Sequence, residues 1–214
     1  MKKQITKIAS PIRILIADDH YIVRMGLIAM VNTEPDMEIV AEATDGAQAI
    51  ALFAKSNPDL ALMDLRMPVK NGIEATIEIC RQNNTARILM LTALDGDEDI
   101  HKALEAGAAG YVLKDSTEEK LMPAIRAVAS GQRWVPEEVA KRLASRRLFE
   151  ELTPRELRVL NELVKGLANK QIAEVLNITE NTTKWYLKGI LAKLRVADRT
   201  AAVAVAIQRG IIRF

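Results

Sequence analysis

The first 130 residues of the chain alternate between two hydrophobic patterns. Five short apolar runs, rich in Ile, Val, Leu and Ala, are separated by stretches whose apolar residues have helical spacing. The runs lie at 12–17, 37–43, 60–63, 86–91 and 110–113, and the helical stretches at 22–31, 47–54, 73–80, 100–106 and 121–129. Uninterrupted apolar runs are typical of strands buried on both faces. Five such β-α units predict an α/β fold, a doubly wound parallel sheet covered by helices on both sides.

This alternation stops after Gly131, where the last of these helices is expected to end. Trp134-Val135-Pro136 interrupts the spacing, and a basic stretch from Pro136 through Arg147 predicts a linker helix. A second domain begins at Leu152. The expected divisions are therefore a first domain at 12–131, a linker at 132–151 and a second domain at 152–214.

The second domain is predicted to be all α-helical. Thr153, Pro154 and Glu156 form a capping box, with Thr as N-cap, Pro at the first helical position and Glu three residues after the cap. The expected helices span 154–165, 169–176, 180–194 and 199–209. The second and third of these have the proportions of a helix-turn-helix.

Charge separates the two halves as well. Residues 1–131 carry 14 Lys and Arg against 19 Asp and Glu, a net charge of −5, whereas residues 132–214 carry 16 against 9, a net charge of +7. A basic domain suggests nucleic acid as its partner, although small domains often carry a few net charges.

No apolar run approaches the roughly 20 residues that span a bilayer, and the N-terminus lacks an apolar signal core, so a cytoplasmic location is expected. The single cysteine, Cys80, is interpreted as a buried, inert thiol.

Polar residues end four of the five apolar runs. They are Asp18, Asp19, Asp64, Thr92 and Lys114. Because the carboxyl ends of parallel strands meet at one edge of a sheet, these side chains are expected to converge there. Each one alone has an ordinary interpretation, as a helix N-cap or a solvated charge. Together, three carboxylates supply the hard oxygen ligands that suit Mg²⁺, and the lysine and threonine suit a phosphoryl group held on an aspartate.

The third helix of the second domain has a distinct outward face. Thr182, Lys184, Trp185 and Lys188 lie opposite its apolar residues, and two lysines four apart suit a helix lying in the major groove of DNA. Lys170 is placed to contact phosphate. Two alternatives remain open: the lysines form an ordinary solvated face, and Trp185 is buried between domains.

Residues 12–131 resemble the receiver domain of a two-component response regulator. The resemblance rests on Asp18-Asp19, Met63-Asp64-Leu65-Arg66-Met67-Pro68, Asn71-Gly72, Leu91-Thr92-Ala93 and Gly110-Tyr111-Val112-Leu113-Lys114. It implies a flavodoxin-like strand order and makes Asp64 the phospho-acceptor. It further implies that Asp19, Asp64 and the backbone carbonyl of Arg66 bind Mg²⁺ directly, that Asp18 acts through water, and that Lys114 and Thr92 bind the phosphoryl group. Tyr111 matches the switch aromatic, which turns inward when Thr92 moves, although a tyrosine in a terminal strand is most often plain packing.

Residues 152–214 resemble the LuxR-type helix-turn-helix domain. The matching segments are Leu152-Thr153-Pro154-Arg155-Glu156, Gly166-Leu167-Ala168-Asn169-Lys170-Gln171-Ile172-Ala173, Thr182-Thr183-Lys184, Lys193-Leu194 and Arg199-Thr200. The two resemblances point to the NarL/FixJ family. By this match Lys184, Trp185 and Lys188 face bases, and Lys170 and Thr182 face the DNA backbone. The helix at 201–207 resembles the contact of a DNA-bound dimer, although a plain core-packing helix would look the same. Thr183, Tyr186 and Leu157 depart from the usual residues, which leaves the DNA sequence preference open.

The resemblance implies a transcription factor controlled by phosphorylation from a partner histidine kinase. Two other classes of protein share part of this pattern. An aspartyl-phosphate phosphatase shares the nucleophile and the metal, but that class commonly has a carboxylate two residues after the nucleophile, where this chain has Arg66. A phosphorylation-independent DNA-binding regulator would keep the acidic edge as a vestigial site.

Overall fold

The computed structural model describes residues 10–92, 97–137, 139–141 and 150–212. The chain divides into two compact units, and each is described by itself. The linker helix expected from Pro136 through Arg147 falls largely on residues outside the described ranges.

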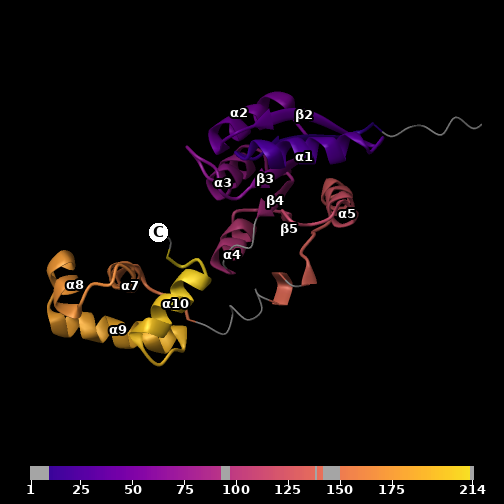
Figure 1. Ribbon diagram of the computed structural model, residues 1–214. Helices are drawn as coiled ribbons and strands as arrows, with labels where there is room; N and C mark the ends of the chain where they lie inside the picture. Colours follow the sequence, from indigo (N-terminus) through magenta and orange to yellow (C-terminus); the bar gives the residue numbers. More distant parts are fainter. Residues whose placement is uncertain (1–9, 93–96, 138, 142–149, 213–214) are drawn as a thin grey trace, which may run out of the picture. The chain divides into compact units, whose positions relative to one another are not determined.

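The first unit contains the predicted parallel sheet (Figure 1). Its strands are β1 (Ile12–Ala17), β2 (Met37–Ala43), β3 (Leu60–Asp64), β4 (Ile88–Thr92) and β5 (Gly110–Leu113). They pair in the order β2-β1-β3-β4-β5, all in parallel, which confirms the expected doubly wound topology. The helices are α1 (Tyr21–Asn32), α2 (Gly46–Ser56), α3 (Gly72–Gln82), α4 (Asp97–Glu105) and α5 (Glu118–Ala129).

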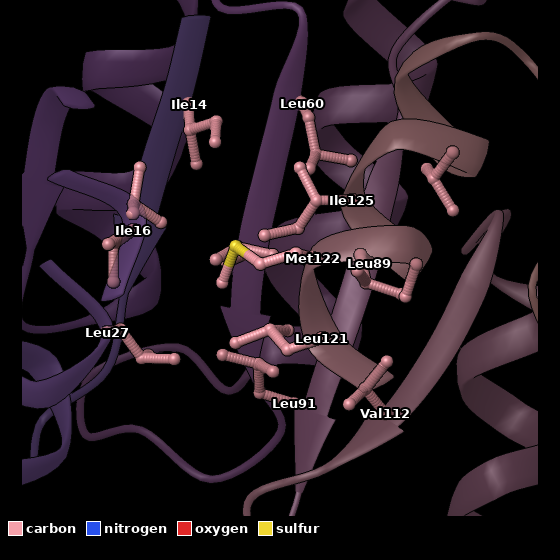
Figure 2. Close-up of a cluster of buried hydrophobic side chains, with 14 of the residues drawn as sticks. Ile14, Ile16, Leu27, Leu60, Leu89, Leu91, Val112, Leu121, Met122 and Ile125 are labelled. Carbon is pink, nitrogen blue, oxygen red and sulfur yellow. The ribbon is translucent and has the colours of Figure 1, made fainter. Parts of the chain in front are cut away.

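One face of the sheet is covered by α1 and α5. Alternate strand residues on this face form a continuous apolar core with both helices, and Figure 2 shows Met122 and Ile125 of α5 directed at the strands. The strand residues are Ile14, Ile16, Leu60, Leu62, Leu89, Leu91 and Val112. The intervening residues face the other side, where the Thr76 hydroxyl of α3 lies 3.7 Å from the sulfur of Met90 on β4. Burial on both faces explains why the strands read as uninterrupted apolar runs.

The second unit contains four described helices around a small core of its own. They are α7 (Pro154–Val164), α8 (Asn169–Leu176), α9 (Glu180–Leu194) and α10 (Arg199–Gln208). Thr153 caps α7 as predicted: its hydroxyl accepts the Glu156 N–H at 3.3 Å, and Glu156 accepts the Thr153 N–H at 2.7 Å. Thr179 likewise caps α9, accepting the Thr182 N–H at 3.1 Å. Both caps use short polar side chains that accept otherwise unpaired helix N–H groups.

One expectation about an individual residue needs correction. Cys80 is half-buried rather than buried, with its sulfur 4.0 Å from the Gly107 carbonyl oxygen, and burial raises the pKa of its thiol. Thr182, expected on the outward face of its helix, is half-buried, and its hydroxyl lies 2.8 Å from that of Thr179 in the cap. Among the described residues, no helix combines the length and apolar character needed to cross a membrane.

Candidate functional site

The predicted acidic edge lies at the carboxyl ends of the strands, and a lysine is at its centre. The Lys114 ammonium is 2.8 Å from Asp18 Oδ2 and 2.9 Å from Asp64 Oδ2. Asp18 is fully buried and Asp64 is 2% exposed. Lys114 follows β5, Asp18 follows β1 and Asp64 ends β3, so three strands bring these groups together. One ammonium thus compensates two buried carboxylates, each of which would be costly to bury unpaired.

Asp19 joins this cluster through a residue that sequence reasoning missed. His20 Nδ1 lies 2.8 Å from Asp19 Oδ1 and 3.3 Å from Asp18 Oδ1. Asp18, Asp19, His20 and Asp64 each offer one ligand atom, and these atoms all lie within 4.8 Å of one another. The sequence could have indicated His20, because it directly follows the acidic pair in a chain with only two histidines. Three carboxylates so close together suit a hard divalent cation such as Mg²⁺.

Burial and proximity shift the pKa values of Asp64 and Lys114. Burial raises the pKa of the Asp64 carboxyl, and the nearby Asp18 charge adds to the rise, which outweighs the opposing effect of Lys114. Burial disfavours the charged form of Lys114, but its hydrogen bonds to Asp18 and Asp64 outweigh this cost, so the pKa of the ammonium is raised. Lys114 therefore remains charged in the physiological range.

Thr92 and Tyr111 lie on the neighbouring strands. Thr92 ends β4 fully buried, and its carbonyl oxygen accepts the Lys114 N–H at 2.7 Å. Tyr111, on β5 beside Met90, is also fully buried. The structure thus places Thr92 next to Lys114 in the backbone ladder and places Tyr111 on β5, three residues before Lys114.

A strained loop connects Asp64 to α3. The Lys70 N–H donates to the Pro68 carbonyl at 2.7 Å, which closes a γ-turn around Val69, whose φ is +64°. The Gly46 N–H holds the loop by donating to the Lys70 carbonyl at 3.0 Å. At the start of α3, a Cβ on Gly72 would lie 2.1 Å from the Asp64 carbonyl oxygen. Only glycine allows the helix to approach the acidic edge this closely. Arg66, in the same loop, is exposed, and its backbone forms a hydrogen bond with the Asp64 carboxylate.

The predicted outward face of α9 is largely as expected. Lys184, Trp185 and Lys188 are exposed, Trp185 to 69%, and Thr183 on the opposite face is buried. The Trp185 ring meets Tyr186 edge-on, with centroids 5.0 Å apart. Lys184 pairs with Glu180 one turn earlier, at 2.7 Å. Lys170 is exposed in the first turn of α8.

A buried acid fixes α9 against α7. Glu156 is 6% exposed, and one of its oxygens lies 2.7 Å from the Lys193 ammonium of α9. Burial raises the pKa of Glu156, but Lys193 and the Thr153 N–H outweigh that effect, and the net shift is downward. A Cβ on Gly189 would lie 2.9 Å from the Glu156 carboxylate. The missing side chain therefore lets the two helices pack closely.

Comparison with known families agrees with this geometry. Residues 14–126 match the family described as "Response regulator receiver domain", and residues 150–206 match "Bacterial regulatory proteins, luxR family". The first match alone covers more than half of the 214 residues. These matches define the class: a response-regulator transcription factor with a helix-turn-helix, and not an enzyme.

Similar proteins extend over nearly the whole chain. "Nitrate/nitrite response regulator protein NarP" of Escherichia coli is 43% identical, over 94% of this chain and 97% of NarP. "Transcriptional regulatory protein LiaR" of Bacillus subtilis is 41% identical, over 91% and 96%. Among solved structures, RcsB from Salmonella enterica bound to promoter P1flhDC in the presence of phosphomimetic BeF₃⁻ is 26% identical, with a TM-score of 0.73 and coverage of 93% and 99%. The chain belongs to the NarL/FixJ family of two-component response regulators, which are DNA-binding transcription regulators.

Proposed function

We propose that Asp64 accepts a phosphoryl group from a partner histidine kinase, and that this event controls dimerisation and DNA binding. The observation that supports this most directly is the Lys114 ammonium within 2.9 Å of both Asp18 and Asp64 at the carboxyl edge of the sheet. The proposal assigns the receiver function to residues 12–131, the linker to 132–151 and the DNA-binding function to 152–214. It also places the protein in the cytoplasm.

Mg²⁺ fits the donor set of the acidic edge. We propose Asp19, Asp64 and the Arg66 carbonyl as its direct ligands, with Asp18 acting through water. The gathering of carboxylate oxygens from Asp18, Asp19 and Asp64 within 4.8 Å supports this assignment. When bound, the cation neutralises charge on the incoming phosphoryl oxygens.

Three residues of the protein have separate roles in the proposed phosphoryl transfer. An Asp64 carboxylate oxygen bonds to phosphorus while the P–N bond of the donor phosphohistidine breaks and the imidazole leaves. Lys114 already lies against the acceptor, so its charge is available to the transferred group without a large rearrangement. The Thr92 hydroxyl donates a hydrogen bond to the same group.

The proposed response begins at Thr92 and ends in the second domain. Movement of Thr92 toward the phosphoryl group vacates space, which Tyr111 fills by turning inward, so a local charge change biases a two-state element. The C-terminal domains then pair, with α10 as the DNA-bound contact. Ile207 of that helix is 43% exposed, which is consistent with a surface that is covered in a dimer.

On DNA, α9 is proposed to enter the major groove. Lys184, Trp185 and Lys188 then face base edges, and Lys170 and Thr182 contact the backbone. The exposure of the first three side chains supports this assignment. The Lys184–Glu180 pair is exposed on both sides, so it competes only weakly with DNA.

Labelling with radioactive acetyl phosphate tests the phospho-acceptor. Asp64→Ala is expected to lose labelling entirely. Asp59→Ala is the matched control, because Asp59 lies just before the same strand at its opposite end, where its carboxylate accepts the Arg13 N–H at 2.9 Å. Labelling of the Asp64 variant at the wild-type level would refute the assignment.

Selection of DNA sites from a random pool, with and without acetyl phosphate, tests whether phosphorylation controls DNA binding. The proposal expects paired half-sites and tighter binding after phosphorylation. Equal affinity in both conditions would favour the alternative, a phosphorylation-independent regulator with a vestigial receiver site.

A further inference from the structure

A hollow lies beside α9, and of its lining residues only Thr182 has a role in the DNA contacts proposed above. It has a volume of about 250 Å³ and lies between α7, the end of α8 and the first half of α9. Its lining is Arg155, Arg158, Val159, Leu176, Ile178, Thr182 and Tyr186. Two of these residues, Thr182 and Tyr186, belong to the same helix as the outward lysines and Trp185. The hollow is therefore continuous with the proposed DNA-facing surface.

The hollow combines apolar and cationic walls. Val159 is buried and Leu176 and Ile178 are half-buried, whereas both arginines are exposed. Arg155 and Arg158 are three residues apart on α7, so their side chains lie on the same face of the helix. In the part of the chain that the structure describes, neither guanidinium has an ion-pair partner. Both charges are therefore available to a ligand without breaking an existing contact.

We infer that this hollow holds one strand of the DNA sugar-phosphate backbone, with Arg155 and Arg158 binding successive phosphates. The inference rests on the proposed function and adds a contact from α7, which lies outside the helix-turn-helix itself. A DNA strand alternates anionic phosphates with apolar deoxyribose faces. Two cationic side chains above an apolar floor match both features. Backbone contacts of this kind set the orientation of a reading helix without carrying sequence information.

Salt dependence gives the inference a quantitative test. Each phosphate contact contributes about 0.9 to the slope of log K against log salt concentration, which corresponds to about fivefold in affinity at 0.15 M salt. The Arg155→Gln/Arg158→Gln variant is therefore expected to lower the slope by about 1.8 and to weaken binding about 30-fold. The loss should be the same on a duplex selected by the full-length protein and on a random duplex of equal length.

Two variants serve as controls. Lys165→Gln removes a charge at the opposite end of α7, about 15 Å from Arg155 at 1.5 Å per residue. Because this separation exceeds the screening length of about 8 Å at physiological salt, its slope should match the wild type. Arg155→Lys/Arg158→Lys keeps both charges and should retain most of the slope. Melting curves of all variants should coincide, since the substituted side chains are exposed.

Several outcomes would overturn the inference. These are a wild-type slope in the glutamine double variant, or a loss confined to the selected duplex, which would indicate base reading. Failure of the proposed function is recognised separately. In that case the wild-type protein does not bind DNA, or Lys184→Gln/Lys188→Gln leaves its sequence preference unchanged.

Discussion

Val69 offers a direct test of backbone strain beside the phospho-acceptor. Its φ of +64° lies in a region that L-residues enter at a cost of about 1–3 kcal/mol, and β-branched residues are especially unfavourable there. The turn is nevertheless held by the Lys70–Pro68 hydrogen bond and by the contact of Lys70 with Gly46. A residue that tolerates positive φ should therefore stabilise the receiver domain.

The size of the effect is a difference of three contributions. Val69→Gly removes about 2 kcal/mol of strain. It costs about 0.7 kcal/mol through the greater freedom of the unfolded chain. Because the Val69 side chain is 81% exposed, lost burial costs only about 0.4 kcal/mol more. The net expectation is a gain of about 1 kcal/mol, or about 3–4 °C in melting temperature. Val69→Asn should give a smaller gain, because asparagine tolerates positive φ better than β-branched valine but favours the left-handed helical region over a γ-turn.

The measurement needs a probe confined to the receiver domain. The chain has two tryptophans, so a Trp185→Phe background leaves Trp134, which packs against the receiver core, as the fluorescent reporter. Urea unfolding in this background gives the free energy directly. Ile77→Gly is the matched control: this exposed, β-branched residue lies inside α3 of the same domain with ordinary helical geometry, so glycine should destabilise there by about 0.5 kcal/mol. Destabilisation by both Val69→Gly and Val69→Asn would refute the strain argument.

Four further predictions concern packing and charge. Gly26→Ala should stabilise the protein by about 0.5–1 kcal/mol, because nothing lies within 4 Å of the added Cβ and alanine favours the helix interior. Gly72→Ala should destabilise it by more than about 2 kcal/mol, since the Cβ would meet the Asp64 carbonyl at 2.1 Å; thermal melts of both variants check the opposite signs. For Glu156, the folded-state pKa lies below its ordinary value of 4.5, so its stabilisation is present above that pH and is lost as the pH falls through the folded-state pKa. In a Trp134→Phe background, unfolding of the second domain followed by Trp185 fluorescence should therefore give a lower free energy of unfolding for Glu156→Gln than for wild type at pH 7, with the difference narrowing toward pH 3. A difference that does not depend on pH would contradict this. Arg126→Ala should cost about 1–2 kcal/mol in urea unfolding, because its guanidinium bonds Asp36 at 2.8 Å and Glu34 at 2.5 Å; no loss would mean that these half-exposed pairs are screened.

Element positions were predicted well where hydrophobic spacing decides them. The strands at 37–43 and 110–113 and the helices at 169–176 and 180–194 match their observed limits. The expected strand at 86–91 starts two residues late, at Ile88, because Ala86 donates to the Asn83 carbonyl in a turn. Helices α4 and α5 begin three residues before their first expected apolar positions. Their first turns are polar, and apolar periodicity does not register such residues.

The acidic edge was predictable because parallel strands expose their carboxyl ends together. What the sequence left open was local geometry. The sequence of the loop around Val69 does not indicate a positive φ, since valine is among the residues least suited to it. The hollow between Arg155 and Tyr186 depends on the packing of three helices, so periodicity along any one of them does not reveal it.

Lys114 links strands of the sheet as well as balancing the charge of two carboxylates. Its ammonium contacts carboxylates that follow β1 and end β3, its backbone N–H is bonded to the last residue of β4, and its own chain continues from β5. A single residue therefore ties four of the five strands at one edge. A change in charge at Asp64 therefore acts directly on the residue that joins these four strands.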